Sequence, residues 1–179
     1  DSARDAEDCS LEPPEAIRPW IHTGIDAADL PPGIARPVRL LLFLDVLEHL
    51  PDPAAFLARM ARAFPAADRA IATVPARAEL WTDYDDFYGH LRRYDAKGLR
   101  ADIEAAGGEV LRLRYIFRLL YPPARIVALR GHRRIALHAP GRAAAWIHRA
   151  IAALCVIDRW VLPGGVPGTS LLCRFRMPR

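Results

Sequence analysis

The fold of this chain is decided by the stretch Leu40-Leu41-Leu42-Phe43-Leu44-Asp45-Val46-Leu47-Glu48-His49-Leu50-Pro51-Asp52-Pro53. Five consecutive apolar residues at its start predict a strand buried in a parallel sheet. Asp52-Pro53 is a typical helix start, with an Asp N-cap followed by Pro in the first turn. Ligands of open α/β sheets bind beyond the carboxyl ends of the strands, so we expect Asp45, Glu48 and His49 to line a functional site.

Strands and helices are expected to alternate along the rest of the chain. A short strand is expected to end near residues 9–13, and further strands at 20–25, 38–44, 70–74, 109–115 and 170–175, with helices at 53–64, 95–106, 124–130 and 142–162. The segment 76–94 has no clear period and is rich in aromatic residues, so we interpret it as a loop over the active face. This alternation predicts one α/β domain over residues 1–179, with a mainly parallel sheet covered by helices on both faces. Residues 1–10 are acidic and look disordered.

The charges are unevenly distributed along the 179 residues. Residues 1–90 carry a net charge of −8 and residues 91–179 one of +12. The basic half indicates either an anionic partner, such as a phosphate group or a membrane surface, or a general bias of this chain toward arginine. No basic run with interleaved aromatic residues indicates a nucleic-acid groove, so no nucleic-acid partner is expected.

The three cysteines, Cys9, Cys155 and Cys173, lie far apart in the sequence. They have no paired spacing that would bind zinc or form a disulfide framework, so we expect neither, and no metal site. A reducing cytoplasm is the default compartment for such a chain. No signal peptide is visible, and the apolar stretch 150–157 is too short to span a bilayer.

Three short motifs, in order, resemble one enzyme family. The stretch LFLDVLEHLPDP resembles the segment after the fourth strand of class I S-adenosylmethionine (SAM) dependent methyltransferases, which are Rossmann-like, doubly wound proteins. Thr73-Val74-Pro75-Ala76 resembles the end of that family's fifth strand, and Leu80-Trp81 with Gly89-His90-Leu91-Arg92-Arg93-Tyr94 is similar to a subgroup related to the UbiE/UbiG-like enzymes (methyltransferase types 11 and 23). The resemblance covers roughly residues 9 to 120, and it implies SAM as cofactor.

The resemblance also implies positions for the cofactor. Glu12 is similar in place to the acid that binds the ribose hydroxyls, although it can equally be a solvated helix cap. Asp26 and Ala27 lie in DAADLP, which resembles the motif whose acid receives the adenine amino group; an ordinary loop aspartate is the alternative. At the end of the fourth strand, the cofactor-binding residues implied by the resemblance are Asp45, Val46 and Glu48.

Two histidines are the candidate catalytic residues, His49 and His90. A histidine near its ordinary pKa can remove a proton from a hydroxyl or enol acceptor as the methyl group arrives. His49 can instead serve only as a cap of the following segment. Trp81, Arg92, Arg93 and Tyr94 are candidates for binding the acceptor's phosphate or carboxylate. The alternative is a structural clamp, in which Arg93 pairs with Asp83 or Asp85 to hold the loop shut.

The helix expected at 142–162 is amphipathic, with Trp146, Ile147, Ala150, Leu154, Ile157 and Val161 on one side. Asp158 lies within this apolar arc. Its apolar side is expected to pack on the sheet or to form a homodimer contact. A peripheral membrane contact is the alternative, because arginines flank a face that carries Trp146.

The glycine-rich motif of the family's first strand is absent, since residues 1–10 contain no glycine. In that family the first strand lies beside the fourth, so the strand 38–44 would be left with an unpaired edge. We therefore expect an N-terminally incomplete copy of a methyltransferase domain, acting on a small-molecule or lipid-linked acceptor at oxygen or carbon. The alternatives are a non-catalytic binding or scaffold module and a peripheral membrane protein.

Overall fold

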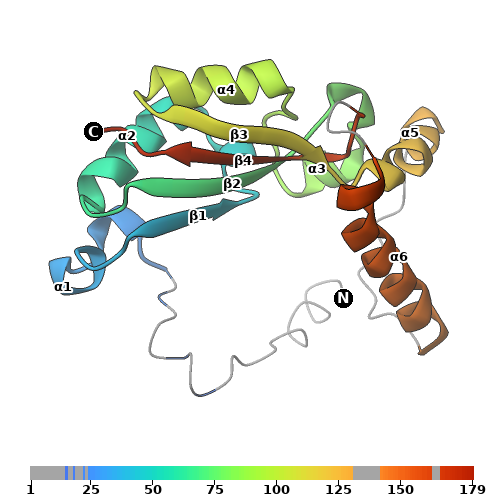
Figure 1. Cartoon of the computed structure of the whole chain (residues 1–179), viewed down its shortest axis with the longest axis horizontal. Coiled ribbons are helices and arrows are strands. Elements are labelled where there is room, and N and C mark those ends of the chain that lie inside the picture. Colours follow the sequence, from blue (N-terminus) through green and yellow to red (C-terminus); the bar gives the residue numbers. More distant parts are fainter. Residues whose placement is uncertain (1–14, 16–17, 19–21, 23, 131–141, 163–165) are drawn as a thin grey trace, which may run out of the picture.

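The computed structural model describes residues 15, 18, 22, 24–130, 142–162 and 166–179 (Figure 1). Glu12, the strand end expected at 9–13 and the disorder expected at 1–10 lie outside these residues. Of the strand expected at 20–25, residues 20, 21 and 23 also lie outside, while Gly24 and Ile25 form a bend.

A single four-stranded sheet forms the centre of the described structure, in the order β1-β2-β4-β3. The strands are β1 (Leu40–Leu44), β2 (Arg69–Pro75), β3 (Glu109–Ile116) and β4 (Ser170–Arg176). β1 and β2 are parallel, whereas β4 runs antiparallel to both β2 and β3. The predicted α/β class is confirmed, but the sheet is parallel only in its first pair, because β4 enters between β2 and β3 from the opposite end.

The described residues include six α-helices, of which the first precedes β1 and the others connect the strands (Figure 1). They are α1 (Pro32–Ala35), α2 (Pro53–Ala63), α3 (Asp83–Phe87), α4 (Ala96–Ala105), α5 (Tyr121–Leu129) and α6 (Arg142–Val161). Short 3-10 turns lie at Ala27–Asp29, Leu47–His49, Ala78–Leu80 and Arg118–Leu120. The predicted strands and helices from residue 38 onward are therefore confirmed to within a few residues.

Side-chain caps fix where the two core helices begin. The Asp52 carboxylate accepts a hydrogen bond from the Ala55 backbone N–H at 2.9 Å, and Pro53 occupies the first turn of α2. In α4, Asp95 caps the Gly98 N–H in the same way. After α4, Gly107 adopts a φ of 88°, the left-handed conformation that commonly ends a helix.

One face of the sheet carries the core. Phe43 of β1 packs edge-on against Phe56 of α2 and stacks with Phe175 of β4. The rest of the buried cluster joins β2, β4, α2 and α4 and includes Leu57, Met60, Ala70, Ala72, Val74, Leu99, Ile103, Leu171 and Cys173. On the other face, Leu40, Leu42 and Leu44 are 47%, 57% and 57% exposed. Among the residues that the structure describes, no helix covers this side of β1, so the expectation of helices on both faces is not met there.

The segment 76–94, expected to be a loop, contains a turn and the helix α3. A capping box starts this helix: the Thr82 backbone N–H donates to Asp85 Oδ2 at 2.9 Å, and the Asp85 N–H bonds back to Thr82. The helix has only 5 residues, too few to give the sequence a visible period. Hence the loop prediction was wrong over 83–87.

The predicted amphipathic helix at 142–162 is confirmed as α6, but its apolar side does not pack on the sheet at two of the predicted positions. Trp146 is 70% exposed and Ile157 is 48% exposed. The helix is instead fastened through Asp158, which is 2% exposed and whose Oδ2 lies 3.3 Å from Nε of the buried Arg118. This ion pair explains why an acid stands in the apolar arc.

Candidate functional site

Asp45 turns the chain at the end of β1. Its φ of 52° places it in the left-handed region, which Asp tolerates better than most residues. The Asp45 N–H donates to the Thr73 carbonyl of β2 at 3.0 Å, and Thr73 Oγ1 donates to Asp45 Oδ1 at 3.2 Å. The turn directs the following residues into a 3-10 segment above the ends of β1 and β2.

Glu48, in that segment, is completely buried. Neither of its carboxylate oxygens has a hydrogen-bond partner. The pKa of the Glu48 carboxyl is raised to about 7, mainly because burial disfavours its charged form and in smaller part because the charge of Asp45 lies nearby. An unpaired buried carboxyl is costly to keep, and such groups are concentrated at functional sites.

The two candidate catalytic histidines, 41 positions apart, meet beside Glu48. The rings of His49 and His90 lie edge to face, with centroids 4.7 Å apart. His49 Nε2 lies 4.0 Å from Glu48 Oε1, and its Nδ1 lies 3.4 Å from the Gly89 carbonyl oxygen. A backbone hydrogen bond also joins the two segments, because the Leu91 N–H donates to the Glu48 carbonyl at 2.9 Å.

A buried carboxylate, Asp85, holds the second histidine and the arginine motif in place. Arg93 Nε donates to Asp85 Oδ1 at 2.7 Å, and His90 Nδ1 lies 2.8 Å from the same oxygen. Burial alone would raise the pKa of Asp85, but the hydrogen bonds from Arg93, His90 and Thr82 outweigh it and lower the pKa. For Arg93, therefore, the structure shows the clamp that the sequence offered as the alternative.

These residues surround a pocket of about 310 Å³ at the carboxyl ends of β1 and β2. It is lined by Asp45, Glu48, His49, Pro75, Tyr88, His90 and Ser170. The prediction that Asp45, Glu48 and His49 would lie together at the end of a parallel strand is thus confirmed. The DVLEH and GHLRRY motifs both contribute to one pocket.

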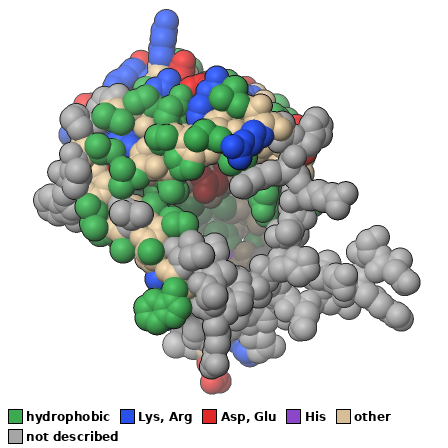
Figure 2. Space-filling model, turned by 90° about the vertical axis from the view of Figure 1, so that its right-hand side faces the viewer, with side chains coloured by type: hydrophobic (Ala, Val, Ile, Leu, Met, Phe, Trp, Pro, Cys, Tyr) green, Lys and Arg blue, Asp and Glu red, His purple; other side chains and the backbone are tan. Residues whose placement is uncertain are grey.

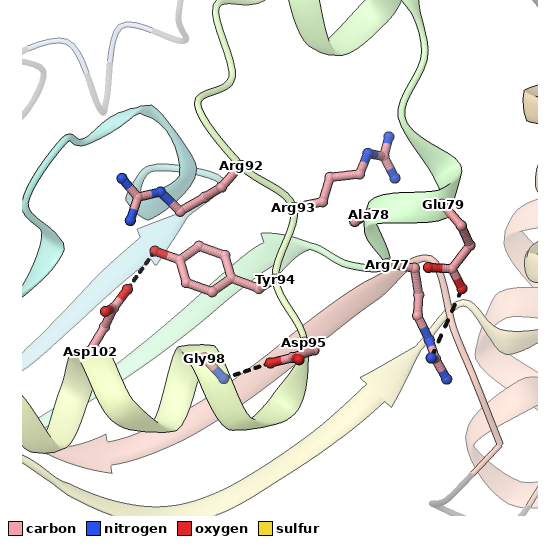
Figure 3. A pocket seen from close by; sticks show the side chains of 9 residues that line it. All are labelled: Arg77, Ala78, Glu79, Arg92, Arg93, Tyr94, Asp95, Gly98 and Asp102. Atoms are coloured by element: carbon pink, nitrogen blue, oxygen red, sulfur yellow. Dashed lines mark hydrogen bonds and ion pairs between the residues drawn. The ribbon is translucent and has the colours of Figure 1, made fainter.

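The remaining residues of the arginine motif lie elsewhere. Arg92, Arg93 and Tyr94 line a second hollow of about 450 Å³ that shares no residue with the first (Figure 3). The Tyr94 hydroxyl donates to Asp102 Oδ2 at 2.9 Å, and Arg92 Nη2 donates to the carbonyls of Leu50 and Pro51 at 3.0 Å. These side chains join the motif to neighbouring elements, so they do not form an acceptor site together with His90.

Three other predicted residues also lie away from the pocket beside His49. Asp26 accepts from Arg59 Nη2 at 2.7 Å and from the Ala28 N–H, and its neighbour Ala27 is exposed in a 3-10 turn. Trp81 Nε1 donates to Asp86 Oδ1 at 3.1 Å. None of the three lines the pocket beside His49.

Val46 precedes the 3-10 turn at Leu47–His49 and is half-buried, and its carbonyl accepts the His49 N–H at 3.1 Å. It therefore supports the site through its backbone.

Two residues of the pocket were not predicted from the sequence, and the sequence alone did not distinguish Asp83 from Asp85 as the partner of Arg93. Tyr88 and Ser170 line it, and no motif marks either of them. Asp85 could have been preferred over Asp83, because Thr82-x-x-Asp85 has the spacing of a capping box.

No protein-family model and no curated protein matches this sequence. Solved structures give looser likenesses. A candidate methyltransferase from Bacillus halodurans C-125 is 14% identical, with a TM-score of 0.44, over 87% of this chain and 70% of that protein. A SAM-dependent methyltransferase from Archaeoglobus fulgidus is 10% identical, with a TM-score of 0.45, over 85% of this chain and 65% of that protein. At these TM-scores the function has to be argued from the chain's own residues.

Among the described helices, none is both long and apolar enough to cross a bilayer.

Proposed function

We propose that this chain carries the acceptor-binding part of a SAM-dependent methyltransferase domain, which methylates oxygen or carbon of a small-molecule or lipid-linked acceptor. One observation supports this most strongly. The two motifs that resemble the family, DVLEH and GHLRRY, are distant in sequence yet place Glu48, His49 and His90 around one pocket.

The position and charge of the pocket fit such a cofactor. It lies beyond the carboxyl ends of the parallel pair β1 and β2, where α/β proteins bind their ligands. SAM supplies a methyl group attached to a positively charged sulfonium. The exposed Asp45 carboxylate and the carboxyl of Glu48 give this pocket an acidic lining that suits a cation.

The acceptor would lose a proton to an imidazole of the pocket. His49 is 37% exposed, and its Nε2 is the ring nitrogen that faces Glu48. Since Nδ1 of both histidines is engaged, Nε2 is the atom available to take the proton. Tyr88 and Ser170 offer further hydroxyl groups to orient the acceptor.

The unpaired outer edge of β1 supports the proposal that the sheet lacks a strand. Within the described part of the chain β1 pairs only with β2, and Leu40, Leu42 and Leu44 are exposed. We propose that a strand with the glycine-rich motif pairs with this edge in the active enzyme and completes the cofactor site. Unpaired strand edges with apolar side chains favour such pairing.

Calorimetry of this chain with SAM and with its demethylated product tests the proposal. We expect both to bind, and Asp45→Ala to weaken binding at least about tenfold, which corresponds to 1.4 kcal/mol. Asp68→Ala, at an exposed acid outside the pocket, is the matched control. Binding would mean that these residues already form a cofactor pocket. Absence of binding by both ligands at millimolar concentration would mean that this chain alone has no such pocket, as expected of a non-catalytic relic of the fold or of a part that lacks the glycine-rich strand.

A peripheral membrane contact is the second candidate function, because apolar side chains are exposed on α5 and α6. Ile126, Leu129, Trp146, Val156 and Ile157 are 51%, 69%, 70%, 61% and 48% exposed. Figure 2 faces the end of the molecule that carries these helices, and hydrophobic side chains lie beside basic ones in this view. Arg149 lies over the Trp146 ring at 5.4 Å, a combination suited to the surface of an anionic bilayer.

Sedimentation with vesicles of phosphatidylglycerol and phosphatidylcholine tests this candidate. Binding should fall when Leu129 and Trp146 are both changed to Ser, and it should remain when the exposed Leu42 is changed to Ser. A chain that stays in solution with these vesicles and sediments as a dimer would assign the same helices to a homodimer contact.

A further inference from the structure

We propose that Glu48, His49 and His90 form a binding site for one divalent transition-metal cation. One ligand atom from each of the three residues lies within 4.8 Å of the others. No metal was expected from the sequence, because the cysteines are dispersed and the donors come from segments about 40 residues apart. The fold brings the donors together.

The hydrogen bonds of the two histidines engage Nδ1 and leave Nε2 free in each ring. Asp85 is an ionised carboxylate and the Gly89 carbonyl is an acceptor, so the Nδ1 atoms of His90 and His49 that face them carry the protons. Nε2 of each neutral ring therefore keeps its lone pair. A metal-binding histidine typically donates its other N–H to a carboxylate or a carbonyl in this way.

Glu48 supplies the independent evidence for a ligand. Its side chain has no exposed surface, it lines the pocket with both histidines, and neither carboxylate oxygen has a partner. A buried carboxylate without a hydrogen bond lacks compensation for its lost hydration. A cation bound between Glu48 and the imidazoles would provide that compensation.

The geometry needs only small side-chain adjustments. Tetrahedral ligands at zinc bond lengths lie about 3.4 Å apart, whereas His49 Nε2 and Glu48 Oε1 are 4.0 Å apart. His49 is partly exposed and its Nδ1 contact is long at 3.4 Å, so its ring is able to rotate toward the others. His90, held by Asp85 at 2.8 Å, is the fixed member of the set.

The donor set indicates the kind of cation. Two imidazoles and one carboxylate suit Zn²⁺, Co²⁺, Mn²⁺ or Fe²⁺, whereas Mg²⁺ prefers oxygen ligands alone. Three protein ligands leave at least one position open toward the pocket of about 310 Å³. Open positions of this kind bind water or a substrate oxygen.

The metal site does not rest on methyl transfer, although it changes how the proposed acceptor would react. With a cation bound, both imidazoles are ligands and neither is free to take a proton. An acceptor hydroxyl on the open position would then lose its proton to solvent water, because the cation lowers the pKa of the hydroxyl. Each histidine can therefore act either as a base or as a metal ligand, and only the second role requires a metal.

Calorimetric titration of the chelator-treated full chain with ZnCl₂, CoCl₂ and MgCl₂ tests the site. We expect one equivalent of Zn²⁺ or Co²⁺ to bind, and Mg²⁺ to bind at least about tenfold more weakly. His49→Ala, His90→Ala and Glu48→Gln should each weaken Zn²⁺ binding at least about tenfold. His22→Ala, at an exposed histidine outside the pocket, is the matched control and should bind as the unaltered chain does.

A measurement on the unaltered chain keeps the test decisive if a variant fails to fold. In ¹⁵N-histidine spectra, one equivalent of Zn²⁺ should shift the Nε2 signals of two imidazoles and leave the other four of the chain's six histidines unchanged. The inference is overturned if no cation binds stoichiometrically, or if the shifted signals or the loss of binding belong to other histidines. SAM is not needed in either experiment, so failure here is separate from failure of the proposed methyl transfer.

Discussion

Nδ1 of His90 lies 2.8 Å from Oδ1 of Asp85, and this contact joins the candidate site to the most completely buried acid of its supporting loop. The same oxygen accepts Arg93 Nε at 2.7 Å, so one carboxylate orients the imidazole and neutralises the arginine. Arg93 Nη1 in turn donates to the Ala76 carbonyl at 3.3 Å, at the end of β2. The position of His90 therefore depends on an ion pair anchored to the sheet.

Asp85→Asn should destabilise the protein strongly, since Arg93 would remain buried without a counter-charge. Breaking a buried pair by changing one partner costs about 3 to 5 kcal/mol, and Arg93 is 14% exposed, so we expect the lower end of this range. Urea unfolding followed by circular dichroism measures the free energy of unfolding. Asp86→Asn, at the exposed neighbouring acid, should change it by less than about 0.5 kcal/mol. Equal effects of the two changes would refute the supporting role of Asp85.

The centre of the site could be predicted because its residues belong to local patterns. An apolar run ending in Asp45 and a helix start at Asp52 fix the strand, the turn and the helix, and with them the edge on which Glu48 and His49 lie. The meeting with His90 depends on contacts such as Leu91 N–H to the Glu48 carbonyl, which link residues 43 apart. No local pattern encodes these long-range contacts.

The roles of Arg92, Arg93 and Tyr94 could not be separated from the sequence. Arginine and tyrosine side chains bind anionic ligands and internal carbonyls or carboxylates by the same hydrogen bonds. The choice depends on which acceptors the fold brings near, and here these are Leu50, Asp85 and Asp102.

Arg118 and Asp158 should control whether α6 stays attached to the domain. Their side chains are 3% exposed, and Arg118 also donates to the backbone carbonyls of Asp158 and Leu162 at 2.9 and 2.7 Å. Arg118→Met should lower the free energy of unfolding by about 3 to 5 kcal/mol, because it leaves the charge of Asp158 buried without a partner. Adding Asp158→Leu should restore part of that stability, since a buried pair can be replaced by apolar side chains.

Hydrogen exchange of the α6 amides, followed by mass spectrometry, reports this attachment directly. Exchange over Arg142–Val161 should accelerate in Arg118→Met and slow again in the double variant, while exchange in β2 changes little. Equal exchange rates of α6 in the unaltered chain, the Arg118→Met variant and the double variant would show that the Arg118–Asp158 ion pair does not hold the helix in place.

Cys173 should react slowly with alkylating agents in the native state. It is buried in β4, and burial raises the pKa of its thiol to about 11. Only about one thiol in a thousand would then be ionised at pH 8. Because the side chain has no exposed surface, labelling also requires β4 to open, and both effects keep the reaction slow.

Iodoacetamide labelling with peptide mass spectrometry separates Cys173 from Cys155, which is only partly buried and serves as the internal reference. Labelling of Cys173 as fast as Cys155 at pH 8 would mean that β4 opens in the native state. Guanidinium should abolish the difference between the two.

Two neighbours in β1 should respond oppositely to substitution, because they point to opposite faces of the sheet. Phe43 is 6% exposed and packs against Phe56 and Phe175. Phe43→Ala should therefore lower the free energy of unfolding by about 3 to 5 kcal/mol, because it removes buried apolar surface and leaves a cavity. Leu42 is 57% exposed, so Leu42→Thr, which keeps a strand-forming side chain, should change the free energy of unfolding by less than about 0.5 kcal/mol. Urea titrations of both variants supply the comparison. A loss of more than about 2 kcal/mol in Leu42→Thr would show that another segment or a second molecule covers this face in solution, because only buried side chains carry such costs.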